Sequence, residues 1–124
     1  MMEKKLSCSC GSAENCTVFA CSGAADLGQA SDLLARKLHK NEVRQMKCLA
    51  FVSAGITEMI DSVKDSNMLV IDGCNLDCGK KTFEKNGLND FIHLRLTDLG
   101  FEKGKTPPTE YVIEKMYEEA IFMV

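Results

Sequence analysis

The sequence lacks any apolar run near the roughly 18 residues that a membrane-crossing helix needs. Its start, Met1-Met2-Glu3-Lys4-Lys5-Leu6, leads into polar and cysteine-rich residues and not into the apolar segment of a signal peptide. Basic residues are not in excess: 15 lysines and arginines stand against 18 acidic residues, the net charge is −3, and the lysines are scattered. We therefore predict a cytoplasmic protein with no membrane partner and no nucleic-acid partner.

Motifs of common enzyme classes are missing as well. No Gly-x-Gly-x-x-Gly sequence and no Walker lysine motif is present, so nucleotide binding has no support. The segment from Cys21 to Gly28 invites comparison with the phosphate-binding cysteine loops of phosphatases and arsenate reductases. Those enzymes need an arginine six residues after the nucleophile, but Leu27 stands there, next to Asp26. The comparison thus argues against a phosphatase.

Only two histidines are present, and neither is placed for catalysis. His39 lies beside a lysine near the end of a predicted helix, where we expect a solvated cap. His93 alternates with Ile92 and Leu94 in a predicted strand, where we expect a satisfied core or edge histidine. The sequence therefore offers no Ser-His-Asp arrangement that could catalyse hydrolysis.

What the sequence does contain is a regular alternation of short apolar runs and helical patterns. Its 124 residues, 45% hydrophobic and 27% charged, fit one soluble domain, and we assign residues 17–124 to it and residues 1–16 to a cysteine-rich N-terminal arm. The predicted strands lie at 17–21, within 46–52, at 68–71 and at 91–96; the predicted helices lie at about 27–40, 56–63, 74–85 and after Pro107-Pro108-Thr109. Such alternation predicts a three-layer α/β/α sandwich with a mostly parallel sheet of about four strands, in a flavodoxin-like or Rossmann-like order.

Seven cysteines are many for a chain of this size, and the number is odd. In a cytosol that keeps thiols reduced, such a set favours metal binding or redox chemistry over structural disulfides. The segment Asp72-Gly73-Cys74-Asn75-Leu76-Asp77-Cys78 follows the third predicted strand. If Cys74 opens a helix, Cys78 lies one turn later on the same face, and both sulfurs can point at one atom.

Two further cysteines follow other predicted strands. Cys21 ends the first strand and Cys48 lies in or near the second. Because the carboxyl ends of parallel strands share one edge of a sheet, Cys21, Cys48, Cys74 and Cys78 could form a tetrahedral thiolate site for Zn²⁺. Zn–S bonds of about 2.3 Å would place the sulfurs about 3.8 Å apart. Larger gaps would indicate a redox role, a missing ion or a site that closes on binding.

The N-terminal arm adds three secondary candidates, Cys8, Cys10 and Cys16. They could form a second soft-metal site, supply a ligand or lid to the first, or act as a resolving arm in disulfide exchange. The alternative is a loose tail with incidental thiols.

A different use of the same thiols is catalysis. A helix N-terminus stabilises a thiolate, so Cys74, with Cys78 or Cys21, could carry out sulfur transfer through a persulfide or dithiol redox chemistry. Asp72 would then orient or deprotonate Cys74, although a carboxylate beside Gly73 at a strand end more simply caps the following helix. A third hypothesis is an Fe–S or electron-transfer protein, and a fourth is a plain interaction domain.

Several ordered sequence blocks resemble the DGC domain family, which takes its name from the central Asp-Gly-Cys. The blocks are Cys10-Gly11-Ser12, Phe19-Ala20-Cys21-Ser22-Gly23-Ala24-Ala25-Asp26-Leu27-Gly28, Ala35-Arg36-Lys37-Leu38, Met46-Lys47-Cys48-Leu49-Ala50, Ile71-Asp72-Gly73-Cys74 with Cys78, and Leu96-Thr97-Asp98-Leu99-Gly100. The resemblance implies zinc binding by four chelating cysteines, which correspond to Cys21, Cys48, Cys74 and Cys78. It implies no particular reaction.

Overall fold

The computed structural model describes residues 15–122, and the chain alternates strands with helices along this length. The strands are β1 (Cys16–Ala20), β2 (Gln45–Met46), β3 (Asn67–Asp72) and β4 (Ile92–Arg95). The helices are α2 (Asp26–Lys40), α3 (Leu49–Ser53), α4 (Thr57–Val63), α5 (Cys78–Lys85) and α6 (Glu110–Ala120), with a 3-10 turn, η2 (Leu96–Leu99), directly after β4.

All four strands are parallel and lie in the order β2-β1-β3-β4. The chain first moves from β1 outward to β2, then returns past β1 to β3 and on to β4, so the direction of winding reverses between β1 and β3. This order is that of a flavodoxin-like sheet without its fifth strand, and ligands of such sheets bind at the carboxyl ends of the strands near the reversal. The predicted α/β fold with a parallel sheet is confirmed.

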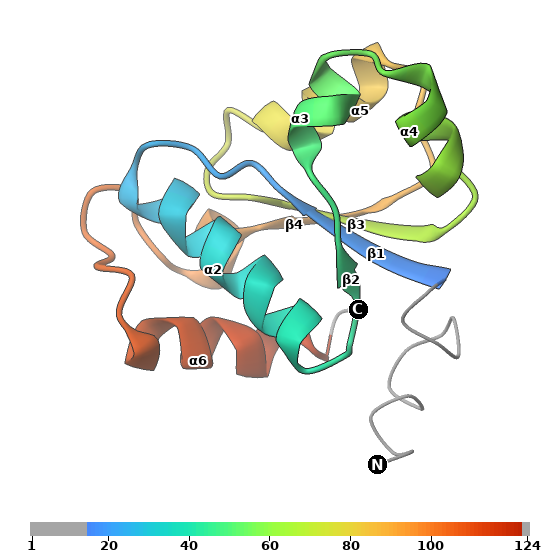
Figure 1. Ribbon diagram of the computed structural model, residues 1–124. Helices are drawn as coiled ribbons and strands as arrows, with labels where there is room; N and C mark the ends of the chain where they lie inside the picture. The colour runs from blue at the N-terminus through green and yellow to red at the C-terminus, as the bar shows by residue number, and fades with distance from the viewer. Residues whose placement is uncertain (1–14, 123–124) are drawn as a thin grey trace.

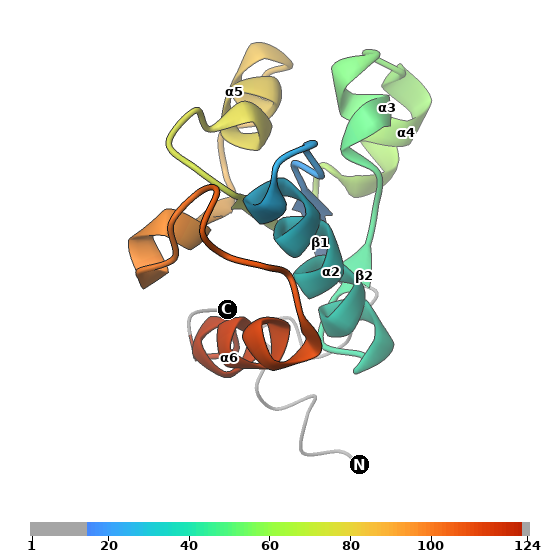
Figure 2. The ribbon, with the colours of Figure 1, turned by 90° about the vertical axis from the view of Figure 1, so that its left-hand side faces the viewer.

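Helices cover both faces of the sheet (Figure 1). On one face, α2 and α6 pack against every second strand residue: Val18 and Ala20 of β1, and Leu69 and Ile71 of β3. Period-2 alternation along a strand sends successive side chains to opposite faces, so the two cores come from interleaved positions. The view in Figure 2 shows α5 on one side of the sheet and α6 on the other.

The second core, under α3, α4 and α5, is built around aromatic rings. Phe19 of β1 meets Phe83 of α5 edge-to-face with ring centroids 4.9 Å apart, and it meets Phe51 of α3 at 6.1 Å. Phe83 in turn contacts Phe91 at 5.1 Å. Such edge-to-face pairs add to the free energy of burial. They fix α3 and α5 on the same face of β1 and β3.

Arg44 links the amino-terminal ends of the strands from inside the protein. Its side chain is 1% exposed, and it donates to the backbone carbonyls of Thr17 and Asn67 and to Asn67 Oδ1 at 2.8–2.9 Å. Burial lowers the pKa of this guanidinium to about 10. The cation is retained because it satisfies acceptors on β1 and β3 at once.

Two predicted elements differ from the structure. The apolar run 46–52 was expected to be a strand, but β2 ends at Met46 and residues Leu49–Ser53 form α3. The helix expected from about Cys74 begins at Cys78 instead, after a loop. Both differences change the surroundings of the cysteines, as described below.

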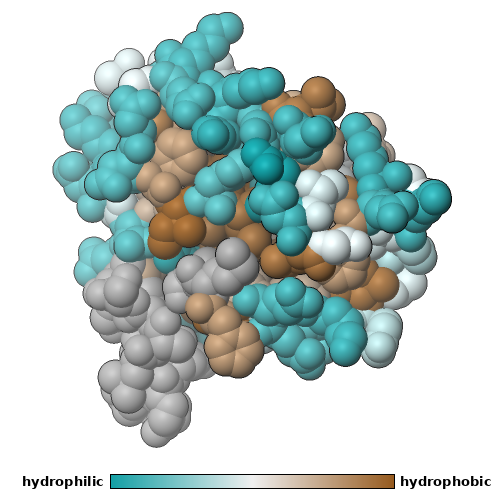
Figure 3. All heavy atoms as spheres, turned by 180° about the vertical axis from the view of Figure 1, so that it is seen from behind, coloured by the Kyte–Doolittle hydropathy of each residue, from teal (hydrophilic) through white to brown (hydrophobic). Residues whose placement is uncertain are grey.

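The sheet ends at β2 on one side and at β4 on the other. Seen from the β4 side, the surface carries a band of hydrophobic side chains between hydrophilic regions (Figure 3). No helix within residues 15–122 has the length and apolar character needed to cross a membrane.

Candidate functional site

Four free thiols lie at the carboxyl edge of the sheet. Cys21 directly follows β1, Cys48 lies two residues after β2, and Cys74 lies two residues after β3. Cys78 is the first residue of α5. Because the strands are parallel, all of these positions fall on one rim, as the sequence predicted.

The four sulfurs do not form the predicted tetrahedral cluster. Within residues 15–122, no three of these thiols lie together at the 4.8 Å separation that a shared ion would allow. The rim instead divides into two parts: Cys21 and Cys48 line one cavity, and Cys74 and Cys78 lie outside it. For sulfurs farther apart than about 3.8 Å, the sequence predicts a redox role, a missing ion or a site that closes on binding.

Cys21 is fixed by a serine of α2. Its Sγ lies 3.3 Å from Oγ of Ser31, a residue with no exposed surface. The Ser31 hydroxyl donates its proton to the carbonyl of Gly28 at 2.7 Å and accepts the N–H of Ser22 at 3.2 Å. With that proton committed, the Cys21 S–H must be the donor in the contact with Ser31.

The other pair of thiols is separated by a loop. Residues 73–77 do not continue a helix: Cys74 lies in a bend, and its Sγ accepts from Lys103 Nζ at 3.7 Å. Cys78 is exposed at the start of α5. The prediction that both sulfurs share one helical face is therefore wrong, because only Cys78 is helical.

Asp72 explains where α5 begins. Its Oδ1 accepts the N–H of Gly79 at 2.7 Å, and its Oδ2 accepts the N–H of Lys80 at 3.0 Å. These are amides of the first turn, which have no partner inside the helix. The predicted capping role of Asp72 is confirmed, although the helix it caps starts four residues later than expected.

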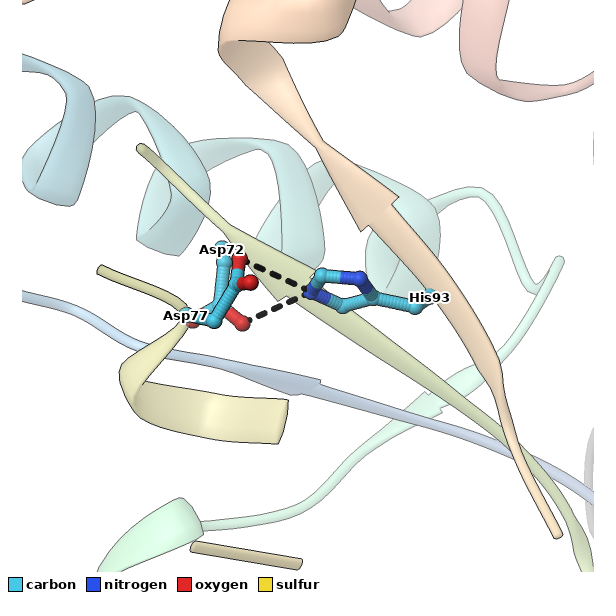
Figure 4. A group of neighbouring side chains, drawn as sticks. All are labelled: Asp72, Asp77 and His93. Atoms are coloured by element: carbon cyan, nitrogen blue, oxygen red, sulfur yellow. Dashed lines mark hydrogen bonds and ion pairs between the residues drawn. The ribbon is translucent and has the colours of Figure 1, made fainter. Parts of the chain in front are cut away.

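His93 approaches the same carboxylate from β4 (Figure 4). Its Nε2 lies 2.8 Å from Asp72 Oδ2 and 3.7 Å from Asp77 Oδ1. A carboxylate only accepts, so Nε2 carries the proton and donates to Asp72. His93 is thus a satisfied, partly buried histidine, as predicted.

Asp77 was not singled out from the sequence. It precedes α5 and is paired with Arg95 of β4 through two hydrogen bonds of 2.8 and 2.7 Å. This pairing lowers the pKa of Asp77 below its ordinary value and raises that of Arg95. The available signal was the i, i+2 spacing of His93 and Arg95, which places both on one face of a strand.

Asp72, Asp77 and His93 are the group of described side chains whose potential metal-ligating atoms all lie within 4.8 Å of one another. Every one of the three already has protein partners: backbone amides and His93 for Asp72, and Arg95 for Asp77. An ion would have to displace these bonds. We interpret the group as a network that ties the start of α5 to β3 and β4.

The secondary candidates are not part of this rim. Cys8 and Cys10 lie outside the described residues. Cys16 is buried at the first position of β1 and is thus separated from Cys21 by the length of the strand, about 16 Å at about 3.3 Å per residue. It cannot share an ion with the rim thiols in this conformation.

Comparison with known families identifies the family of this chain. The family model described as DGC domain matches residues 17–120. The chain belongs to the DGC domain family. In this DGC domain the three residues of the motif have separate roles. Asp72 caps α5, Cys74 lies on the rim, and Gly73, which has no side chain, lets the loop after β3 pack closely against α2. A Cβ at Gly73 would lie 2.9 Å from backbone atoms of Leu27, at the start of α2.

A curated protein similar to this DGC domain is the anaerobic and virulence modulator AnvM of Pseudomonas aeruginosa. The two are 29% identical over 87 residues, which cover 69% of this chain and 66% of AnvM. The match therefore spans just under two thirds of the length of that protein. No solved structure matches the chain significantly.

Proposed function

We propose that this DGC domain binds a thiophilic metal ion, with Zn²⁺ as the first candidate, through Cys21, Cys48, Cys74 and Cys78. The observation that carries the proposal is that three separate strands each deliver a free thiol to one rim, across the reversal point between β1 and β3. Such a set of donors is the one that soft divalent ions prefer.

The donor chemistry fits Zn²⁺, but the spacing in this structure does not. A tetrahedral site needs all four sulfurs about 3.8 Å apart, and no three of the described cysteines meet even a 4.8 Å limit. Binding therefore requires the segments after β1, β2 and β3 to move toward one another. The proposal is accordingly an open site that closes on its ion, as in a carrier or sensor.

The carboxylate and histidine network offers the rival site. Asp72, Asp77 and His93 already lie close enough for one ion, but hard oxygen donors dominate this group and their lone pairs are engaged. Zn²⁺ accepts such mixed ligands, so the two sites must be separated by experiment.

The experiment is a titration of the reduced, chelator-free protein with Zn²⁺ alone, read by competition with a chromophoric chelator. Outer-sphere substitutions weaken metal sites by about 10–100-fold, so Cys74→Ser and Cys78→Ser, which remove ligands, should weaken binding by more than that. The control His93→Gln leaves every thiol in place and should bind Zn²⁺ as the original protein does. No uptake of Zn²⁺, or loss of uptake in His93→Gln with full uptake in both cysteine variants, would exclude a thiolate site.

A second candidate function is thiol chemistry at Cys74, which the ammonium group of Lys103 near its sulfur favours. It predicts turnover of a disulfide or persulfide donor by the metal-free protein that is lost in the same Cys74→Ser variant. The name of AnvM describes a modulator of anaerobic behaviour and virulence. A sensor role for the rim thiols, by ion binding or by oxidation, would be compatible with a modulator of this kind.

A further inference from the structure

A cavity of about 670 Å³ lies between α2 and α3, beside the edge strand β2. Its volume is within the range of small-molecule binding sites. Cys21 and Cys48 both line it, and the apolar part of the wall includes Ala20, Met46 and Leu49. The two thiols thus line one cavity, to which Cys74 and Cys78 do not contribute.

The charged residues of the cavity wall leave an excess of positive charge. Arg36 donates from Nε to Asp32 Oδ2 at 2.6 Å, and this pair is neutral as a whole. Lys47 also lines the cavity and has no acidic partner there. Among the described residues, no hydrogen-bond partner occupies the two terminal nitrogens of Arg36, so its fork remains available to a second carboxylate.

The two thiols differ in their availability. Cys21 is partly buried and donates to Ser31, as described above. Cys48 is exposed, precedes the first turn of α3, and makes no hydrogen bond within residues 15–122. Cys48 and Arg36 both line the cavity, so the thiol and the guanidinium face the same space.

We propose that this cavity binds a low-molecular-weight disulfide that carries a carboxylate, and that Cys48 exchanges with it to form a mixed disulfide. The carboxylate lies against Arg36 and Lys47. The Cys48 thiolate attacks one sulfur of the ligand, a Cys48–S bond forms as the ligand's own S–S bond breaks, and the second half leaves as a thiolate that takes a proton from water. Cys48 is thereby oxidised, and the leaving half is reduced to a thiol.

This inference goes beyond ion binding, because it uses one thiol and a cationic wall and needs no metal. The two proposals can also fail separately. Cys74→Ser and Cys78→Ser remove ligands of the proposed ion site and leave every residue of the cavity wall in place.

The test uses the metal-free full chain with two probes: 3,3′-dithiodipropionic acid, which is anionic, and bis(2-hydroxyethyl) disulfide, which is neutral. Adduct formation is followed by intact mass, the modified cysteine is located by peptide mapping, and each rate is divided by the rate of the same probe with the neutral thiol 2-mercaptoethanol. We expect Cys48 to be modified first, and the anionic probe to be favoured about fivefold, the factor for one charge pair at about 4 Å in water.

Arg36→Gln should abolish the preference for the anionic probe without changing the rate of the neutral one. Lys115→Gln removes the same charge from α6, which contributes no residue to the cavity wall, and should keep the preference. Cys48→Ser should lose the adduct, whereas Cys78→Ser, which removes another exposed thiol, should keep it. Equal normalised rates for the two probes, or first modification at any other cysteine, would overturn the proposal.

Discussion

Arg95 holds Asp77 by two parallel hydrogen bonds, from Nε to Oδ1 at 2.8 Å and from Nη2 to Oδ2 at 2.7 Å. Asp77 has a φ of +56°, a left-handed conformation that is uncommon for a residue with a side chain. A two-point contact of this kind fixes orientation as well as distance. Arg95 thereby holds the residue that precedes α5, and together with the cap from Asp72 it fixes where Cys78 lies relative to β4.

Replacing Arg95 by glutamine should loosen the start of α5. The amides of Gly79 and Lys80, which donate to Asp72 in the first turn, should exchange with deuterium faster by a factor of about 2 to 10, which corresponds to the net contribution of about one hydrogen bond. Hydrogen exchange followed by NMR measures this directly. Arg36→Gln breaks an ion pair within α2 and serves as the control; unchanged protection at Gly79 and Lys80 in Arg95→Gln would contradict the positioning role.

Acidification should weaken the attachment of the segment after η2 to α2. The N–H groups of Gly104, Thr106 and Leu27 donate to the Asp26 carboxylate at 2.7–2.9 Å, and those of Gly104 and Thr106 chiefly hold its pKa below the ordinary 3.8. A carboxylate whose pKa is lower in the folded state stabilises the fold at pH values above its unfolded-state pKa. That stabilisation is lost as the pH falls through its folded-state pKa.

The Asp26 contribution should therefore be complete at neutral pH and disappear below about pH 4. Urea unfolding of the original protein and of Asp26→Asn across this range isolates it from the other carboxylates. The two stability curves should converge as the pH decreases, since the amide cannot ionise. A constant difference down to the lowest pH would show that Asp26 acts by shape alone.

Gly73→Ala should destabilise the protein by about 1–3 kcal/mol, because its Cβ would be forced against the backbone of Leu27 at 2.9 Å. Gly23→Ala is the matched control: the nearest atom to its Cβ would be 3.9 Å away, so a change within about 0.5 kcal/mol is expected. Equilibrium unfolding in urea measures both. Equal losses would mean that close packing is not why glycine occupies the centre of the Asp-Gly-Cys motif.

The second strand shows why part of the fold could not be predicted. A short apolar run has no period that separates a strand from a buried helix. Here β1 pairs with β2 only through Gln45 and Met46, and the next residues turn into α3 so that Phe51 and Val52 enter the core beside Phe19. That preference is set by the shape of the core, which the local sequence does not contain.

The start of α5 has a similar explanation. From the sequence, Asp72 is a good candidate to cap a helix, and it does so. Where the helix begins depends on distant residues: Leu27 occupies the space that a Cβ at Gly73 would need, and Arg95 holds Asp77 in its left-handed conformation. Leu27 and Arg95 are distant in sequence from Gly73 and Asp77, so a local sequence pattern cannot reveal either contact.

The sequence by itself determined the α/β class and the presence of free thiols at one rim, because apolar periodicity marks strands and helices and parallel strands end at one edge. Tertiary structure alone decided the strand order, the pairing of Asp72 with His93, and the division that places Cys21 with Cys48 in one cavity and leaves Cys74 and Cys78 outside it. Distances between loops depend on strand spacing and on loop conformation, which contacts between remote residues set.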